Sequence, residues 1–436
     1  MLVLRGFFGV LVFLGVALLL SVNKKKVTWR PILWGVVIQC VIAVLLFRIP
    51  GGIKAFIVIN NVVVGLLDHA REGAYLVFGQ LAIPPGNVGP QGEQSLGFFL
   101  AFQALPTIIF FSAFMSLLYF VGIMPLILRG FSTVFTKLMR ISGAESLCTA
   151  SNIVVGIESV FSIRPYLATM TKSEFHQILT AGMATIASSV LGFYVLLLKD
   201  TFPMIAGHLV SASLLSAPAA IVMAKILYPE TETPETLGKV VSGERIHANS
   251  PIEAILSGAN EGLKLTLGIV ALLIAFLGLV SLANAIIGWS GLQLSHVGLP
   301  LENISIEQIL GWIFYPFTVL MGVDIQDAGT ISVILGERTI MTEVVSYQHL
   351  SQLIAANQLA DMERSAMLAS YALCGFSHVA AIAIFVGGIA SLVPERARDI
   401  AQLGFRAMIA GTLACFQTAA IAGIFVPAGK SILFMG

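Results

Sequence analysis

The sequence is poor in charge. Asp, Glu, Lys and Arg make up 11% of its 436 residues, about half of the roughly 25% typical of soluble proteins. Hydrophobic residues make up 57% and the mean hydropathy is +0.93, so polar groups cannot cover a water-facing surface. These values predict a polytopic membrane protein in a lipid bilayer. The net charge of +1 also argues against nucleic acid as a partner, because nucleic-acid binding requires a strongly basic face.

Motifs for other chemistry are also missing. The four cysteines stand far apart without a CxxC pair, which gives neither a metal site nor a disulfide framework. There is no HExxH and no GxSxG, and the seven histidines do not cluster. The segment Gly429-Lys430-Ser431 is preceded by Ile424, where a phosphate-binding loop needs its first glycine. We therefore predict neither ATP-driven transport nor enzyme activity, and no cofactor.

Long apolar stretches are abundant instead. A spanning helix needs about 20 mostly apolar residues. The first stretch is followed at once by Lys24, Lys25 and Lys26, which argues against a cleaved signal peptide and places that end of the helix in the cytoplasm. By the same charge rule the chain begins and ends on the outer side. The apolar stretches cover about residues 2–22, 32–47, 98–123, 176–198, 208–227, 263–289, 310–322, 367–393 and 407–426.

Four other segments are not simple spans. Residues 50–97 contain a broken apolar run and two Gly/Pro-rich turns, which predicts an outer-surface helix and loop. In residues 125–140 apolar side chains alternate with basic ones, a pattern typical of an amphipathic helix along the cytoplasmic interface. The aromatic-rich residues 306–322 predict a second interfacial helix, and residues 228–251 a polar cytoplasmic linker.

Two further segments, 142–170 and 324–350, are too polar to cross the membrane alone. Each has the length of two half-membrane helices, which predicts two re-entrant hairpins buried in protein or lining a cavity. The order of long helix, interfacial helix, hairpin and two helices then occurs twice. The predicted units are residues 1–97 with the first scaffold helices and the outer-surface segment, 98–227 with the first repeat, the linker 228–251, and 252–436 with the second repeat.

The helices after the two hairpins share a local pattern. Residues 182–187 (GMATIA) align with residues 375–380 (GFSHVA), which places Thr185 and His378 in the same slot of an otherwise apolar helix. Repeats with polar hairpins and interrupted helices indicate a secondary transporter whose substrate site lies near the bilayer midplane at the repeat interface.

The carboxylates of the hairpins are the first candidates for that site. A charge at membrane depth needs a partner or a function. The first hairpin contains Glu158 beside Gly156, and the second contains Glu343. Each carboxylate either contacts substrate or is bound by the backbone or by a nearby arginine, Arg164 or Arg338.

Three uncharged polar residues are further candidates. His378 either contacts a ligand or is a hydrogen-bonded core residue. Asn152 and Thr185 either bind a cation or cap and back-bond their helices. The sequence pattern leaves both alternatives open for each of the three.

Several stretches resemble one known family. They are LPTIIFFSA at residues 105–113, SNIVVG at 151–156, YPETE at 228–232, ALCGF at 372–376 and AGTL at 410–413. In this order they look like the concentrative nucleoside transporters. The resemblance implies an all-α protein with eight transmembrane helices, two re-entrant hairpins, an inverted-repeat transport domain, a scaffold domain and a homotrimer. It also implies sodium- or proton-driven nucleoside uptake. Without the extra N-terminal spans of some members, the chain is similar to the bacterial ones, which implies a multi-pass protein of the cell inner membrane.

The resemblance also implies a sodium site. The family uses an Asn near the first hairpin tip, carbonyls just after it, and a hydroxyl in the following helix. The matching positions are Asn152, the Val155 carbonyl, Thr185 and the Ile186 carbonyl. Retention of the Asn favours sodium over protons.

The first hairpin tip departs from the family pattern. The family reads Gly-Gln-Ser/Thr-Glu followed by Pro, with these side chains facing the nucleobase. This chain has Glu158 and Ser159 in a tip that is one residue shorter and lacks the Gln and the Pro. The family position that Glu158 occupies therefore stays open.

The residues expected on the ribose side of the site also differ in part from the family pattern. The resemblance assigns Glu343 and Phe376 to family positions. Thr342 stands where an Asn is usual, His378 replaces a ribose-binding Asn, and Ala381 replaces a Ser. These changes predict a specificity that differs from the family pattern, such as a modified nucleoside or a nucleoside-like ligand.

We therefore expect a secondary active nucleoside importer that is coupled to sodium and works by elevator-like movement of the transport domain. One alternative is coupling to protons through His378 or Glu158. Another is a non-transporting membrane receptor or an intramembrane enzyme on the same scaffold.

Overall fold

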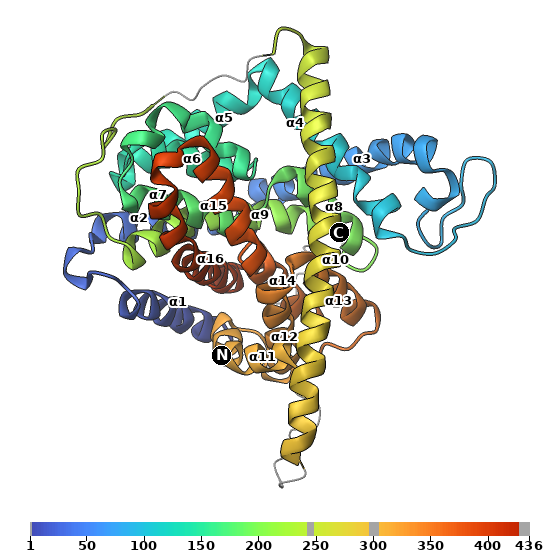
Figure 1. Cartoon of the computed structure of the whole chain (residues 1–436). Helices are drawn as coiled ribbons and strands as arrows, with labels where there is room; N and C mark the ends of the chain where they lie inside the picture. The colour runs from blue at the N-terminus through green and yellow to red at the C-terminus, as the bar shows by residue number, and fades with distance from the viewer. Residues whose placement is uncertain (1, 242–247, 296–304, 427–436) are drawn as a thin grey trace.

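The computed structural model describes residues 2–241, 248–295 and 305–426. Helices form almost all of this part of the chain, as the apolar composition predicts (Figure 1). The fold class predicted from the sequence, an all-α polytopic membrane protein, is confirmed. The N-terminal region contains α1 (Leu2–Leu19), α2 (Trp29–Phe47) and α3 (Pro50–Phe78).

The same order of elements then occurs twice, as the sequence predicts. The first repeat contains α4 (Pro106–Val121), α5 (Ile123–Val134), a hairpin of α6 (Gly143–Asn152) and the 3-10 stretch η5 (Ile157–Thr169), α7 (Lys172–Ala184), α8 (Ser188–Leu198) and α9 (Ile205–Leu227). The second contains α10 (Pro251–Ser295), α11 (Ile306–Met321), a hairpin of α12 (Ile325–Ile340) and α13 (Glu343–Ala355), α14 (Met362–Leu373), α15 (Val379–Leu392) and α16 (Ala397–Phe425).

The region expected as an outer-surface helix and loop contains a longer helix than its broken apolar run predicted. α3 is uninterrupted over 29 residues, and Figure 1 shows it projecting to one side of the molecule with the loop that follows. The segment Pro50–Ala82 is long and apolar enough to cross a membrane. Its place on the outer surface stays a prediction.

Eight helical segments of the described residues are long and apolar enough to span a membrane. This number equals the predicted one, but its members differ. α3 is included, whereas the predicted helix at residues 367–393 is not, because it is divided into α14 and α15, of 12 and 14 residues.

The prediction of continuous helices after each hairpin is therefore wrong. The chain is unwound at residues 185–187, between α7 and α8, and at residues 374–378, between α14 and α15. The two breaks touch each other: Ser377 Oγ donates to the Met183 carbonyl at 2.8 Å. Gly375 has φ +134°, and a Cβ at this position would lie 2.8 Å from the same carbonyl oxygen. A polar contact between two distant segments thus replaces hydrogen bonds that an intact helix would make.

Hairpin 1, which is α6 with η5, is fixed at its base by charge and capping. Ser142 and Glu145 form a capping box that begins α6, and Thr171 and Glu174 form another that begins α7. Lys225, in the last turn of α9, is only 4% exposed and pairs with Glu145 at 2.7 Å. Both partners are buried, so the pair anchors hairpin 1 to the end of α9.

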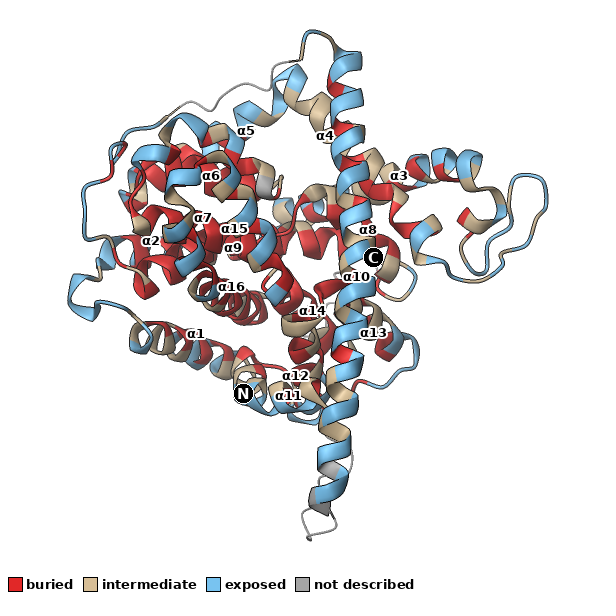
Figure 2. Ribbon diagram, viewed as in Figure 1, coloured by how far each residue is buried: buried red, intermediate tan, exposed pale blue. Residues whose placement is uncertain are grey.

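The long helix α10 lies along α4 at the side of this body (Figure 1). Gly258 and Gly262 form a GxxxG spacing on the contact face, and a Cβ at either would lie within 2.8 Å of the α4 backbone. Small residues at this spacing let two membrane helices approach closely. Figure 2 shows that α10 and α3 are largely exposed, whereas the helices behind them are mostly buried.

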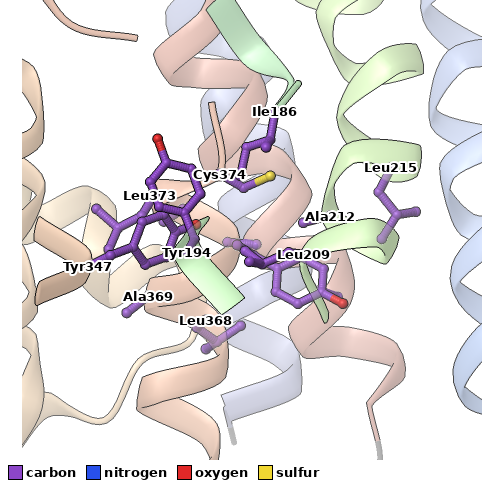
Figure 3. Packing of buried hydrophobic residues seen from close by; sticks show 14 of the residues in the cluster. Ile186, Tyr194, Leu209, Ala212, Leu215, Tyr347, Leu368, Ala369, Leu373 and Cys374 are labelled. Carbon is purple, nitrogen blue, oxygen red and sulfur yellow. The ribbon is translucent and has the colours of Figure 1, made fainter. Parts of the chain in front are cut away.

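The buried core lies among the two broken helices, α9, α13 and α16. Figure 3 shows Tyr194 of α8 beside Tyr347 of α13, next to Leu373 and Cys374 at the second break. The two tyrosine ring centroids are 4.7 Å apart. This packing joins hairpin 2, which is α12 with α13, to the broken helices of both repeats.

Candidate functional site

Glu343 lies at the tip of hairpin 2. It is the first residue of α13, where the positive end of the helix dipole favours a carboxylate. Glu343 is only 4% exposed. The preceding residue, Thr342, is buried, and its hydroxyl has no hydrogen-bond partner among the described residues. The tip thus places two buried acceptor groups side by side.

Two side chains from other elements reach Glu343. Tyr194 of α8 donates its hydroxyl proton to Oε1. His378 Nε2 lies 3.1 Å from Oε2, within ion-pair distance. A carboxylate oxygen has more than one lone pair, so Oε2 keeps the capacity to accept a further hydrogen bond from a ligand.

His378 connects the second break to Glu343. This residue is the N-cap of α15: its Nδ1 accepts the Ala381 backbone N–H at 3.2 Å, and the His378 carbonyl accepts the same N–H at 3.1 Å. The other ring nitrogen, Nε2, faces Glu343.

Phe376 and Ala381 complete this side of the site. Phe376 lies in the break, half-buried, with its ring centroid 6.5 Å from the His378 ring. Ala381 is buried and contributes its backbone N–H to the cap, not a side chain that could bind ligand. The structure thus brings together Thr342, Glu343, Phe376 and His378, with Ala381 beneath them.

The four predicted sodium ligands lie where the tip of hairpin 1 meets the first break. Ser188 N–H donates to the Val154 carbonyl at 2.7 Å, which holds the tip against residues 185–187. Asn152 donates its amide N–H to the Cys148 carbonyl, and its Oδ1 is buried without a partner among the described residues. Thr185 Oγ1 donates to the Ala181 carbonyl and keeps its lone pairs. These oxygen atoms fit the preference of a hard cation.

Glu158 and Ser159 belong to a separate cavity of about 370 Å³ between hairpin 1, α4, α8 and α10. Ser188 and Ser189 of α8 line it, as does Glu261 of α10. Ser151 also lines this cavity; it is 1% exposed and its hydroxyl has no partner among the described residues. The wall is therefore rich in hydroxyl groups and contains two carboxylates.

The helix α8 connects the two groups of residues. Ser188 begins it, beside hairpin 1, and Tyr194 lies six residues later, against hairpin 2. At 1.5 Å per residue the separation along the helix is about 9 Å. The two hairpins thus contact the same short helix.

The predicted alternatives with arginine are wrong for both carboxylates. In the described part of the chain, Glu158 forms no ion pair with Arg164, although both line the cavity. Arg338 donates to the Ala372 carbonyl and not to Glu343. Sequence reasoning missed Tyr194 and Glu261; the only signal for either was its polarity within an apolar helix.

Family profiles match most of the chain. Residues 8–81 match the N-terminus of the Na+ dependent nucleoside transporters, residues 208–423 match their C-terminus, and residues 101–201 match a nucleoside recognition (Gate) family.

Curated relatives and solved structures agree with these profiles. The chain is 39% identical to solute carrier family 28 member 3 of Mus musculus, over 97% of this chain and 58% of that protein. It therefore spans a little more than half the length of that relative. It is 33% identical to an uncharacterized transporter of Haemophilus influenzae, over 99% of this chain and 100% of that one. The structure of CNTnw in an inward-facing substrate-bound state is similar, with 31% identity, a TM-score of 0.85 and 98% coverage of both chains.

These relatives are transporters and not enzymes, and the similarity covers the two hairpins, both broken helices and the helices around them. The chain belongs to the family of concentrative, sodium-dependent nucleoside transporters.

Proposed function

We propose that the protein imports nucleosides in symport with sodium across the cell inner membrane. The observation that carries this proposal is the buried tip of hairpin 2, where Thr342 Oγ1 has no hydrogen-bond partner among the described residues and the Glu343 carboxylate faces only His378 and Tyr194. A buried polar atom without a partner is costly unless a ligand satisfies it. The vicinal hydroxyl groups of a ribose supply the donors that an ionised carboxylate requires.

The remaining contacts follow from the geometry. Phe376, half-buried beside His378, offers an apolar face to the sugar. Tyr194 holds Oε1 of Glu343, which orients Oε2 toward the ligand. The nucleobase then extends along α8 toward Ser188, Glu158 and Ser159, which line the cavity at hairpin 1.

The cavity supports a specificity that differs from the family pattern. Its carboxylates, Glu158 and Glu261, accept hydrogen bonds when ionised, so they favour bases with amino groups. Glu158→Gln and Glu261→Gln are the test. We expect each to lower the uptake of cytidine relative to uridine, and an unchanged cytidine-to-uridine ratio in both variants would contradict this assignment.

We propose Asn152, the Val155 carbonyl, Thr185 and the Ile186 carbonyl as the sodium ligands. The unpartnered Asn152 Oδ1 supports the proposal. The ion would join hairpin 1 to the unwound residues 185–187, and would thereby couple the position of that hairpin to the ion gradient.

We further propose an elevator mechanism in a homotrimer. α7, α9 and α16 pack against one another as one body, whereas α10 packs mainly along α4. α4 and α10 meet hairpin 1 and the start of α8 at the cavity, and movement of the hairpin side past α4 and α10 would expose the ligand to the opposite side. The exposed apolar residues of α10, such as Ile274, Leu279 and Ile286, would face lipid or a second copy of the chain. Mass photometry in detergent tests the trimer.

Uptake by proteoliposomes tests the function. Radiolabelled nucleoside is offered with an inward sodium gradient, with an equal potassium gradient, or with a pH gradient alone. We expect accumulation with sodium only, its loss in Glu343→Gln, and a large rise in the half-saturating sodium concentration in Asn152→Ala. Accumulation that follows the pH gradient and ignores sodium would favour the proton-coupled alternative. Binding without accumulation under any gradient would favour a receptor.

A further inference from the structure

Arg338 is a buried cation without an acidic partner. It lies in the last turn of α12 and is 0% exposed. Its guanidinium donates to the Ala372 carbonyl at 2.5 Å and reaches Thr412 Oγ1 at 3.5 Å, and it stands 5.9 Å above the Phe416 ring. Among the residues that the structure describes, no carboxylate lies within ion-pair distance, and Nε has no hydrogen-bond partner.

Two helix ends supply the compensating charge. Arg338 belongs to the C-terminal turn of α12, and Ala372 is the penultimate residue of α14. The C-terminus of a helix carries about half of a negative elementary charge. Two such ends together balance about one cation, which explains why a guanidinium is tolerated at this depth without a carboxylate.

The first repeat has the same two helix ends but no basic side chain. α6 ends at Asn152 and α7 ends at Ala184, and neither helix has a basic residue in its last turn. The Ser188–Val154 hydrogen bond joins the segments that follow these two ends. In place of a guanidinium, this position contains the unpartnered Oδ1 of Asn152, the proposed sodium ligand.

We propose that Arg338 is a built-in cation that takes, in the second repeat, the position that a sodium ion takes in the first. Through the Ala372 carbonyl it ties hairpin 2 to the second break, and so it positions Glu343 against His378. The inference rests on the sodium site proposed above. It implies that the hairpin 2 side of the site is held permanently, whereas hairpin 1 is held only while sodium is bound.

Arg338→Lys and Arg338→Met are the matched test, because lysine keeps the positive charge and methionine keeps much of the length without it. Each full-length variant is reconstituted in proteoliposomes, and nucleoside uptake is measured as a function of sodium. We expect Arg338→Lys to keep the sodium dependence of the unmodified protein. In Arg338→Met the second repeat must take an ion from solution, so the Hill coefficient for sodium rises by about one and uptake at low sodium falls about tenfold.

Equal sodium curves for Arg338→Lys and Arg338→Met overturn the inference, and so does an equal loss of uptake in both, because the positive charge would then not matter. If Arg338→Met does not fold, Arg338→Ala is purified with methylguanidinium, which replaces the missing guanidinium group. The added methylguanidinium must then restore the thermal shift that nucleoside induces. Failure of this rescue also overturns the inference. The unmodified protein is measured alongside, which distinguishes a failure of this inference from a failure of the proposed function. Sodium-independent uptake by the unmodified protein would refute the proposed function itself.

Discussion

Two substitutions of His378 distinguish the effects of its two contacts. Nδ1 caps α15 through the Ala381 amide, and Nε2 faces Glu343 at 3.1 Å. His378→Ala removes both contacts. His378→Asn keeps a residue that caps helices well but is too short to reach the carboxylate in the same way.

The magnitudes follow from these contacts. Loss of an N-cap costs about 1 kcal/mol, within a range of roughly 0.5–2 kcal/mol. We therefore expect the free energy of unfolding of His378→Ala to fall by this amount. The free energy of unfolding of His378→Asn should differ from that of the unmodified protein by only a few tenths of this amount. In His378→Ala the carboxylate of Glu343 also loses a neighbour that restricts its rotation. We expect the nucleoside affinity of that variant to fall about tenfold, which corresponds to about 1.4 kcal/mol.

Two measurements check this reasoning. Thermal unfolding in detergent, with and without nucleoside, reports the stability and the affinity of each variant. Uptake driven by a pH gradient without sodium reports proton coupling. If His378→Asn is as unstable as His378→Ala, Nδ1 is not the cap. If the unmodified protein takes up nucleoside with a pH gradient alone and His378→Asn abolishes this uptake, then His378 carries the coupling proton.

Two further predictions concern stability and are read from thermal unfolding. Lys225→Met leaves Glu145 buried without its partner and should lower the free energy of unfolding by about 3–5 kcal/mol. The double variant Lys225→Met with Glu145→Gln should recover most of that loss. If it does not, the packing of the lysine methylenes matters more than the charge of the lysine. Gly375→Ala should cost about 1–3 kcal/mol, because φ is +134° and the new Cβ would lie 2.8 Å from the Met183 carbonyl oxygen. Its control, Gly387→Ala on α15, meets no atom within 4 Å and should be neutral or slightly stabilising; equal effects of the two would contradict the close approach of the breaks.

The hairpins were predictable because their polarity conflicts with a membrane span. Residues 142–170 and 324–350 were too polar to cross and too rich in apolar residues to be loops, and the structure forms two-armed hairpins over most of both ranges. The repeated order of elements followed from the same reading. These features depend on local composition, which the bilayer constrains strongly.

The breaks at residues 185–187 and 374–378 were not predictable in the same way. Each break carries only one or two polar side chains, Thr185 in the first and Ser377 and His378 in the second, and hydropathy does not distinguish an intact helix with such residues from one that unwinds for three to five residues. The unwound backbone is stable because a distant segment satisfies it, as Ser377 does for Met183.

Resemblance to the family supplied the candidate residues, and the structure arranged them. Glu343, Thr342 and His378 lie together, as expected of a site, but Tyr194 joined them only because packing of α8 on α13 places its hydroxyl at Glu343. Glu158 lines a cavity that Glu343 does not line, together with Glu261 of a helix about a hundred residues away.

The sequence by itself determined that this chain crosses a membrane, that it contains two polar hairpins in a repeated order, and that a few carboxylates must lie at depth. Each follows from the cost of placing polar groups in hydrocarbon, which can be judged residue by residue. Only the tertiary structure decided which of those groups have partners. It paired Lys225 with Glu145, left Arg338 without a carboxylate, and left the acceptors of Asn152 and Glu343 open. The reason is physical: the state of a buried polar atom depends on which distant helix end or side chain packs against it, and hydropathy along the chain does not contain that information.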